Sequence, residues 1–443
     1  MQSLYFFCFL RINAFSEKET VQSLNASKSD VNNLYTIKIR LNIERRGSLL
    51  NFAFTNRLFV FCTSLLIITL LPAKNVLSAK KVNHYRSQYK SALLADVESG
   101  RILFHDRMHQ IIYPASLVKM MVSLIVLEEI DAGRISFQDS VKVSRWASKI
   151  GGHQVYLKQG EIFQLRELMK AIVISSANDA SVAVAEHVSG RDKQFIKKMN
   201  KRAVELGMKK TRFFSVHGLP PGRGQKLDES TAFDMYLLAM ELLKHPQYLR
   251  WSSTRLDSFR NGTFQLLNTN HRLIRNYRGM DGMKTGYHRR AGFNLVSTAE
   301  REGQRFISII IGAKNSYLRS KSVKHFLDYG FNNFLKIELI KKEDTVPYFA
   351  DVEGGESEKV SLKSSETVRI LLNAEELKRL EIRPQIPSNT RAPVAAEQKL
   401  GTLEYWLDGK MLKKIALHTE YAVPEQSILS KLTGMLTKLS KAN

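Results

Sequence analysis

The stretch that decides the fold is residues 113–121, which read Tyr-Pro-Ala-Ser-Leu-Val-Lys-Met-Met. Pro114 is typical of the first turn of a helix, and an almost continuous apolar run follows it. We therefore expect a helix over 117–130 that is buried on all sides and too short to span a membrane. Ser116 and Lys119 lie three residues apart and so share a helix face. A desolvated lysine releases its proton readily, so Lys119 can act as a base toward the Ser116 hydroxyl.

Composition limits the kinds of protein that this chain can be. It has 443 residues, 44% hydrophobic and 25% charged, which is ordinary for a globular protein of two domains. The formal net charge of +25 favours an acidic partner such as anionic lipid head groups, an anionic polymer or nucleic acid. The sequence carries no recognisable nucleic-acid-binding motif, so we expect no nucleic-acid partner.

Residues 1–79 have the layout of a targeting segment. Arginines precede an apolar run at 58–71, and small residues close the segment at Ala79, as in a cleaved secretory signal. A single membrane anchor is the alternative, although the apolar run is short for one. Both cysteines, Cys8 and Cys62, fall inside the segment. Cleavage after Ala79 would leave neither a disulfide nor a cysteine nucleophile.

A polar corner between two expected helices is the second informative stretch. Apolar residues repeat at helical spacing over 165–173, and the repeat resumes over 182–188. Between them, Ser176 and Asn178 either cap the second helix or project a hydroxyl and an amide into a cleft. Earlier in the chain, His153 is expected to be a solvated loop residue rather than a metal ligand, because no second ligand stands at a helical spacing from it.

The third stretch predicts an antiparallel sheet. The expected strands are a hairpin over 91–104, followed by 280–287, 291–299 and 306–311. The strand at 280–287 carries Lys284 and Thr285 between glycines, and a glycine there lets a ligand backbone approach closely. The alternative is an exposed edge strand that a lysine protects from aggregation.

The three motifs occur in the order S-x-x-K, S-x-N, K-T-G, which is the signature order of penicillin-binding proteins and class A β-lactamases. More narrowly, the chain resembles the serine-type D-alanyl-D-alanine carboxypeptidases (peptidase S11-like), the low-molecular-mass penicillin-binding proteins of bacterial cell walls. Further stretches that look like this family are 216–219, 281–286, 291–295, 401–403 and 407–410. The resemblance extends from about Ser91 to the C-terminus.

The resemblance implies catalytic roles for Ser116, Lys119, Ser176 and Asn178, and a supporting role for Lys284. Ser116 would attack the carbonyl between two terminal D-alanines, and Lys119 would take its proton. Ser176 with Asn178 would relay a proton toward the leaving amine. Lys284, held near Lys119, would help to keep Lys119 neutral.

The resemblance also implies the groups that bind the substrate. The residues that would do so are Lys284, Thr285, Gly286 and Arg319. The lysine, the threonine and the arginine would grip the terminal carboxylate. The backbone N–H groups of Ser116 and Tyr287 would form an oxyanion hole, a contact worth roughly 3 to 4 kcal/mol of barrier. Relatives often carry histidine at the position of Tyr287. Because the backbone N–H makes this contact, we expect activity to survive, and the sequence leaves the effect of Tyr287 on substrate preference open.

The expected fold class is α/β: a β-lactamase/transpeptidase-like catalytic domain with an antiparallel sheet and a helical cluster, then a small all-β domain and a C-terminal amphipathic helix. The expected boundaries are 1–79 for the N-terminal extension and signal peptide, 80–337 for the catalytic domain, 338–423 for the β-rich domain and 424–443 for the helix. Short apolar runs at 360–362, 368–372 and 402–407 predict strands of the β domain. In the tail, apolar residues form one stripe with lysines largely off it, which suits an anionic membrane surface. A helix packed on the β domain is the alternative.

Together these features predict a serine D-Ala-D-Ala carboxypeptidase that trims peptidoglycan stem peptides, is acylated by β-lactams, and needs no cofactor or metal. We expect an exported, periplasmic protein, peripheral on the outer face of the bacterial cytoplasmic membrane. One alternative is a β-lactamase, although the E-x-x-x-N element of class A enzymes is not evident between Asn178 and Lys284. The other is a non-catalytic wall-associated module. The joint presence of four residues argues against it, namely Ser116, Lys119, Ser176 and Lys284.

Overall fold

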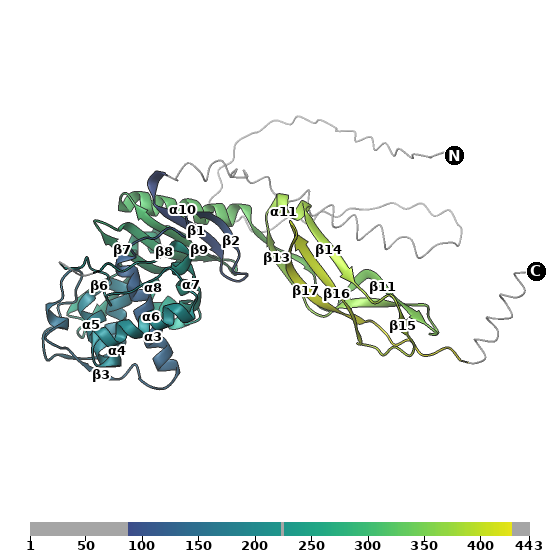
Figure 1. Cartoon of the computed structure of the whole chain (residues 1–443), viewed down its shortest axis with the longest axis horizontal. Helices are drawn as coiled ribbons and strands as arrows, with labels where there is room; N and C mark the ends of the chain where they lie inside the picture. The colour runs from purple at the N-terminus through teal and green to yellow at the C-terminus, as the bar shows by residue number, and fades with distance from the viewer. Residues whose placement is uncertain (1–86, 223–225, 428–443) are drawn as a thin grey trace, which may run out of the picture. The chain divides into compact units, whose positions relative to one another are not determined.

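The structure is a computed structural model that describes residues 87–222 and 226–427 (Figure 1). An α/β part extends from β1 to α10, and an all-β part from β10 to β17. The signal segment expected over 1–79 and residues 428–443 of the expected C-terminal helix lie outside the described residues. Residues 424–427, where that helix is expected to begin, are not helical, because Glu425 forms a β-bridge with Gly355. None of the described helices is long and apolar enough to cross a membrane.

A five-stranded antiparallel sheet forms the centre of the α/β part, in the order β2-β1-β9-β8-β7. Its strands are β1 (Ser91–Asp96), β2 (Ile102–Asp106), β7 (Met280–His288), β8 (Gly292–Arg301) and β9 (Gln304–Ala313). The predicted hairpin and the three later strands are therefore confirmed. β7 is an edge strand, and Lys284 lies opposite Val296 of β8.

Helices cover both faces of this sheet, with α10 on one face and the larger cluster on the other (Figure 1). The helices are α3 (Val118–Asp131), α4 (Leu165–Lys170), α5 (Asn178–Ser189), α6 (Asp192–Glu205), α7 (Ala232–Leu242), α8 (Pro246–Ser253), α9 (His271–Asn276) and α10 (Ser316–Asn333). Successive strand residues point to opposite faces, so Leu93 packs in the core of the larger cluster while Leu94 packs in the core under α10. Two short hairpins, β3 (Ser140–Lys142) with β4 (Ile162–Gln164) and β5 (Leu256–Phe259) with β6 (Phe264–Leu267), complete this part.

Helix α3 confirms the predicted buried helix. Every residue from Val118 to Leu127 is buried, including Lys119. Each fully buried large aliphatic or methionine side chain contributes about 1.5–3 kcal/mol. Together the apolar side chains of α3 offset the cost of taking one lysine out of water. The helix ends at Asp131, and Gly133 just beyond it has a φ of +69°, which is typical of a glycine at a helix end.

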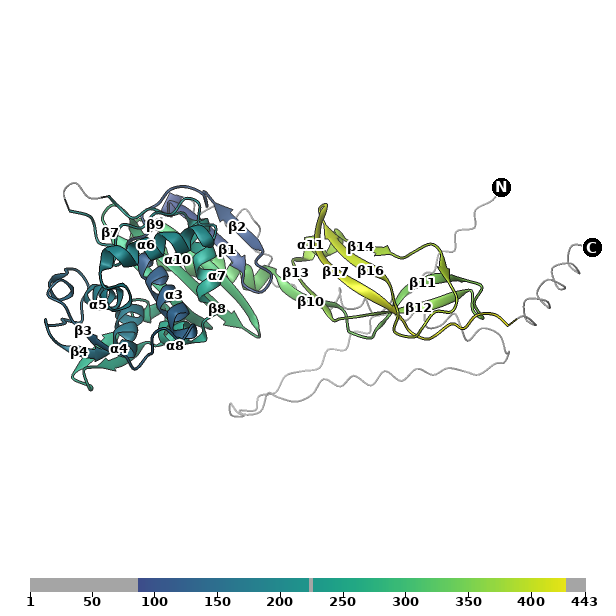
Figure 2. The ribbon, with the colours of Figure 1, turned by 60° about the horizontal axis from the view of Figure 1, so that its bottom comes forward.

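The all-β part contains the predicted small β domain. Its elements are β10 (Leu335–Ile340), β11 (Thr345–Glu353), β12 (Lys359–Ser364), β13 (Val368–Leu372), α11 (Ala374–Lys378), β14 (Leu380–Gln385), β15 (Thr390–Arg391), β16 (Lys399–Leu407) and β17 (Lys410–Thr419). A six-stranded sheet has the order β14-β16-β17-β12-β11-β15, and β10 pairs with β13. β16 and β17 run side by side as a hairpin (Figure 2). Asp408 and Gly409 form its turn, and both have positive φ angles, as a two-residue hairpin turn requires.

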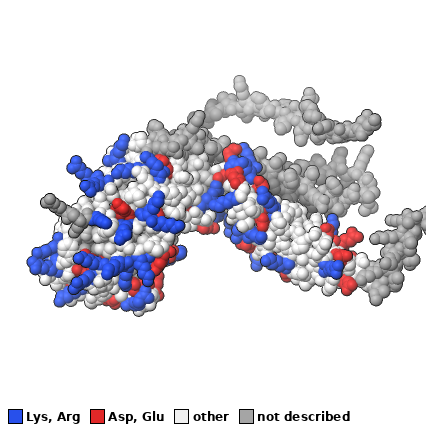
Figure 3. Space-filling model, viewed as in Figure 1, with Lys and Arg blue, Asp and Glu red and all other residues white. Residues whose placement is uncertain are grey.

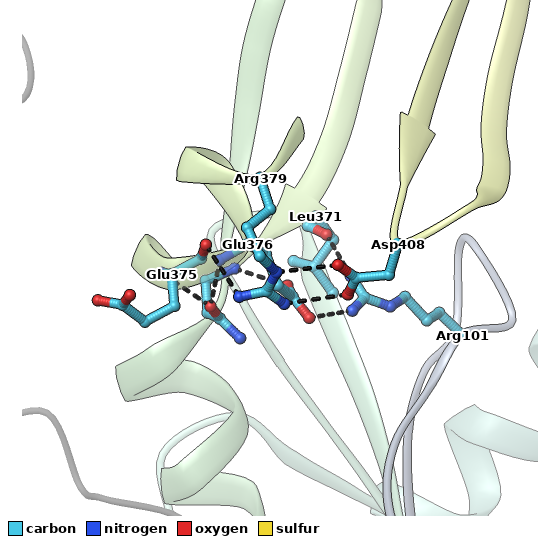
Figure 4. Close-up of polar contacts among 7 residues, drawn as sticks. Arg101, Leu371, Glu375, Glu376, Arg379 and Asp408 are labelled. Atoms are coloured by element: carbon cyan, nitrogen blue, oxygen red, sulfur yellow. Dashed lines mark hydrogen bonds and ion pairs between the residues drawn. The ribbon is translucent and has the colours of Figure 1, made fainter. Parts of the chain in front are cut away.

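Polar contacts tie the β1–β2 turn to α11 and its neighbours (Figure 4). The Arg101 guanidinium donates to the carbonyl oxygen of Leu371 at 2.9 Å and pairs with Glu376. Nearby, Arg379 forms a two-pronged ion pair with Asp408, with N–O distances of 2.9 and 3.0 Å. Glu376 is almost fully buried, so we expect its pairing with Arg101 to matter more than an exposed ion pair would.

Candidate active site

The first two site residues meet where a short turn leads into α3. Ser116 lies in the 3₁₀ turn Ala115–Leu117, and Lys119 lies in the first turn of α3. The Lys119 amine is 3.2 Å from the Ser116 hydroxyl oxygen. It also donates to the Asn178 side-chain oxygen and to the His217 carbonyl oxygen, both at 2.7 Å. A neutral lysine has two N–H groups for these acceptors and a lone pair for the Ser116 hydroxyl, so the geometry suits a base.

Burial sets the protonation state of Lys119. Desolvation holds the pKa of Lys119 well below its ordinary value, and the nearby positive charge of Lys284 lowers this pKa further. The carboxylates of Asp228 and Asp179 act in the opposite direction and have smaller effects. The site therefore favours the neutral amine.

Asn178 orients Lys119 rather than capping a helix. Its side-chain oxygen accepts from Lys119, and its side-chain nitrogen donates to the Gly151 carbonyl oxygen at 2.7 Å. Asn178 is the first residue of α5, and no side chain caps this helix. The capping alternative for Ser176 and Asn178 is therefore wrong. Both ends of the Asn178 amide are occupied by fixed partners, which holds Lys119 in one direction.

Ser176 and Lys284 form a second buried pair. A π-helical turn, Ala171–Ser175, ends at Ser176, whose φ of 66° is left-handed and turns its side chain out of the helix. The Lys284 amine donates to the Ser176 hydroxyl at 2.8 Å and to the Thr285 carbonyl oxygen at 3.0 Å. Lys284 is 2% exposed, so the alternative of a protective lysine on an exposed edge is wrong. Burial, and secondly the charge of Arg319, lowers the pKa of Lys284 to about 7.

A cleft of about 740 Å³ joins the three motifs. Its lining includes the predicted site residues Ser116, Ser176, Asn178, Thr285, Gly286, Tyr287 and Arg319. Arg319 reaches it from α10, and burial lowers the pKa of this guanidinium to about 10, so it stays charged at neutral pH. The Tyr287 ring is 56% exposed and stacks on Phe293 with 4.2 Å between ring centroids. His153 is an exposed loop residue on the wall of the cleft, as predicted.

Gly286 is needed for a close approach within the chain itself. A Cβ atom on Gly286 would lie 2.6 Å from the Pro114 carbonyl oxygen and 3.3 Å from the Leu117 side chain. The sequence interpretation placed a ligand backbone against this strand, whereas the structure places the turn that carries Ser116 there. The absence of a side chain at 286 therefore lets β7 lie directly beside the serine.

Asn294 is one residue that the sequence reasoning missed. Its side-chain nitrogen donates to the carbonyl oxygens of Tyr113 and Pro114 at 2.9 and 3.1 Å, and its oxygen accepts the Gly312 N–H at 2.8 Å. It is fully buried in β8. These bonds fasten the start of the serine turn to the sheet. The signal available in the sequence was an amide side chain among the apolar residues at the start of an expected strand.

The second group that the sequence reasoning missed is a hydrogen-bonded pair of residues that holds a loop next to Lys119. Asp228 is 6% exposed and accepts two backbone N–H groups, at 2.6 and 2.9 Å, and the Ser215 hydroxyl, at 2.7 Å. Ser215 in turn accepts the Gly218 N–H at 2.8 Å. Between these two residues lies His217, whose carbonyl oxygen accepts from Lys119. We call Asp228 and Ser215 the Asp228 bracket. Nothing in the sequence links it to Lys119.

Comparison with known proteins agrees with this geometry. Residues 78–315 match the family described as Peptidase S11, D-alanyl-D-alanine carboxypeptidase, and residues 334–425 match the C-terminal domain of penicillin-binding protein 5. The D-alanyl-D-alanine carboxypeptidase DacF of Bacillus subtilis is 36% identical over 337 residues, which cover 75% of this chain and 85% of the relative. DacD of Escherichia coli is 30% identical, with 77% of this chain and 89% of the relative covered.

Solved structures are similar as well. Penicillin-binding protein 5 from Haemophilus influenzae matches with a TM-score of 0.61 and 29% identity, covering 76% of this chain and 98% of that one. Penicillin-binding protein D2 from Listeria monocytogenes, in its ampicillin-bound form, matches with a TM-score of 0.51 and 32% identity, covering 55% of this chain and 97% of that one. The second match is confined to about half of this chain.

Proposed function

The chain belongs to the D-alanyl-D-alanine carboxypeptidase family of serine hydrolases, and we propose that it removes the terminal D-alanine from peptidoglycan stem peptides through an acyl-enzyme on Ser116. The observation that carries this assignment is the hydrogen bond between Ser116 and a buried Lys119 whose pKa is lowered. Ser116 is bonded to an amine whose pKa is lowered, and it shares its cleft with the Arg319 guanidinium, while the buried Lys284 donates to Ser176 on the same cleft. Such a site is suited to attack a peptide that ends in a carboxylate.

In the proposed acylation step, Lys119 takes the Ser116 proton as the hydroxyl oxygen bonds to the carbonyl carbon between the two D-alanines. The backbone N–H groups of Ser116 and Tyr287 receive the oxyanion, and one such donor is worth about 3–4 kcal/mol of barrier. The close packing of Gly286 on the serine turn supports this pairing, because it brings β7 next to Ser116.

The bond to the leaving D-alanine then breaks, and its nitrogen needs a proton. We assign the delivery of this proton to the Ser176 hydroxyl, which takes a replacement proton from the Lys284 ammonium that donates to it. When water then hydrolyses the acyl-enzyme, Lys284 recovers a proton from that water through Ser176, and the Lys119 ammonium returns its proton to Ser116. The proton relay expected of Ser176 and Asn178 together is thus assigned to Ser176 alone. An amide side chain is neither an acid nor a base near neutral pH, so Asn178 is a positioning residue for Lys119.

Lys284, Thr285 and Arg319 are the proposed carboxylate clamp. Arg319 lines the cleft, and its Nε atom has no hydrogen-bond partner among the described residues. A buried guanidinium without a partner is unfavourable, and a substrate carboxylate would supply one. The bound carboxylate would also favour the charged form of Lys284, whose pKa burial lowers to about 7.

We further propose the domain division 1–79, 80–337, 338–423 and 424–443, with export and peripheral attachment to the outer face of the cytoplasmic membrane. The family matches at 78–315 and 334–425 support the two central boundaries. The net charge of +25 supports an anionic surface as partner. Lys and Arg are widespread on the visible face of the α/β part (Figure 3).

Labelled penicillin tests the assignment of the nucleophile, because a β-lactam mimics the terminal dipeptide and should leave a covalent adduct. Peptide mapping should place that adduct on Ser116, and Ser116→Ala should remain unlabelled. An adduct elsewhere, or labelling that persists in the variant, would overturn the assignment. A long-lived adduct together with D-alanine release from a stem peptide distinguishes a carboxypeptidase from a β-lactamase, which would release the hydrolysed drug rapidly.

A further inference from the structure

A second pocket adjoins the catalytic cleft between α9 and α10. The two cavities share the lining residues Thr269, His271, Ser316 and Arg319. The second has a volume of about 350 Å³, and we call it the α9–α10 pocket, comprising residues 269–273, 276, 316, 317, 319, 320 and 324. No acidic side chain is among these residues. Arg319 therefore lines both the catalytic cleft and the α9–α10 pocket.

Two buried donors in this lining have no acceptor. Asn270 is 5% exposed, and its side-chain nitrogen has no hydrogen-bond partner among the described residues. It precedes α9 at the N-cap position, yet its side chain does not cap the helix. The Arg319 Nε atom is likewise buried without a partner. A buried donor without an acceptor is unfavourable, so two in one pocket point to a ligand with acceptor oxygens.

The charge of the pocket has one sign. Arg272, Lys324 and Arg319 contribute positive charge, and within residues 87–222 and 226–427 none of the three belongs to an ion pair. Cations that converge on a small cavity with unpaired N–H groups suit an oxyanion, because each oxygen can accept hydrogen bonds while the charges are neutralised.

We propose that the α9–α10 pocket binds a small oxyanion, a phosphate or carboxylate group, through Arg272, Lys324 and Asn270, and that Arg319 is shared between this anion and the substrate carboxylate. Two sources offer this chemistry: free inorganic phosphate and the carboxylate of the released D-alanine. An anion bound in the pocket partly neutralises the charge of Arg319 and so weakens the interaction of Arg319 with the substrate carboxylate. This effect on turnover rests on the proposed function, whereas binding itself does not.

The test measures binding to the full chain by calorimetry at constant ionic strength, with inorganic phosphate in one arm and D-alanine in the other. The double variant Arg272→Gln/Lys324→Gln removes two charges from the pocket. The matched control, Lys193→Gln/Lys197→Gln, removes two charges from α6. We expect wild type and control to bind one of the two probes with the same Kd. The pocket variant should bind that probe at least tenfold more weakly. In wild type, that probe should raise KM several-fold with little change in kcat.

Saturable binding of phosphate alone assigns the pocket to a free anion, and binding of D-alanine assigns it to the product. No binding of either probe, or equal binding by the pocket variant and the control, overturns the inference. Penicillin labelling of Ser116 separates a failure of the pocket hypothesis from a failure of the proposed function. A labelled enzyme that binds neither probe refutes only the pocket, and an unlabelled enzyme that binds phosphate refutes only the proposed function.

Discussion

The Lys284 amine donates a 2.8 Å hydrogen bond to the Ser176 hydroxyl, although 108 positions separate the two residues in the chain. Lys119 forms the other amine–hydroxyl pair, with Ser116 at 3.2 Å. The two lysines have the same chemistry and different partners. Lys119 is surrounded by acceptors that suit a neutral amine, whereas the buried Lys284 donates to Ser176, a residue of the cleft in which a substrate carboxylate is proposed to bind. Their replacement should therefore have different consequences.

Lys119→Arg should abolish acylation by both substrate and penicillin, because a guanidinium stays charged and cannot accept the Ser116 proton. General-base catalysis contributes about 10²- to 10⁴-fold, so kcat/KM on a D-alanyl-D-alanine peptide should fall at least that far. Lys284→Arg should keep some turnover, since a cation still faces the carboxylate, and Lys284→Ala should lose much more. Activity in Lys119→Arg, or equal inactivity in Lys284→Arg, would contradict this division of roles.

The pH profile of kcat/KM should be bell-shaped. Lys119 must be neutral, so activity rises with pH through its lowered pKa. Lys284 is charged below its pKa of about 7, so in the free enzyme its charge, and with it carboxylate binding, declines as the pH rises above that value. In Lys284→Arg the alkaline limb should move to higher pH, because the guanidinium keeps its charge. An alkaline limb that stays in place in this variant would mean that another group causes it.

Asp228→Asn tests the Asp228 bracket. Asp228 raises the pKa of Lys119, so its neutralisation should lower that pKa and move the acid limb of the profile to lower pH. The loop that places the His217 carbonyl should also loosen, and kcat should fall about tenfold or more. Asp234→Asn is the control, since Asp234 is also buried and hydrogen-bonded but does not contribute to the pKa of Lys119. Asp234→Asn should lower the melting temperature without moving the acid limb of the pH profile. If the acid limb lies at the same pH in both variants, the proposed role of the Asp228 bracket is refuted.

Gly286→Ala should slow penicillin acylation and destabilise the fold by about 1–3 kcal/mol, because the new methyl group must displace β7 from the Pro114 carbonyl. Gly151→Ala is the control, because a Cβ atom there meets nothing within 4 Å. Stopped-flow acylation rates and urea unfolding measure the two effects. Unchanged acylation in Gly286→Ala would show that the approach of β7 to the serine turn is not needed.

Deletion of residues 424–443 tests the proposed membrane attachment. The amphipathic tail adds apolar area and lysine charge to the interaction with anionic lipid, so its removal should release an active enzyme into the soluble fraction. Flotation with anionic vesicles measures the change, and penicillin labelling checks that the site is intact. If the truncated protein still floats, an uncleaved segment at 58–71 becomes the better explanation.

The sequence by itself determined the helices and strands that carry the site. A run of apolar residues without a polar face predicts a buried helix, and a serine and a lysine three positions apart on it must share a face, because the helical period dictates this locally. Apolar runs separated by turn residues likewise predicted the antiparallel strands. These predictions depend on neighbours in the chain, which is why they could be made without the fold.

Only the tertiary structure decided which groups surround the two lysines. Asn294 binds the carbonyls before Ser116, and Asp228 orients the loop whose His217 carbonyl holds Lys119. The lowered pKa values arise from burial and from charges brought together across the fold, and neither is a local property of a motif. Gly286 illustrates the difference: the sequence indicated a close approach, and only packing identified the approaching group as the backbone at Pro114.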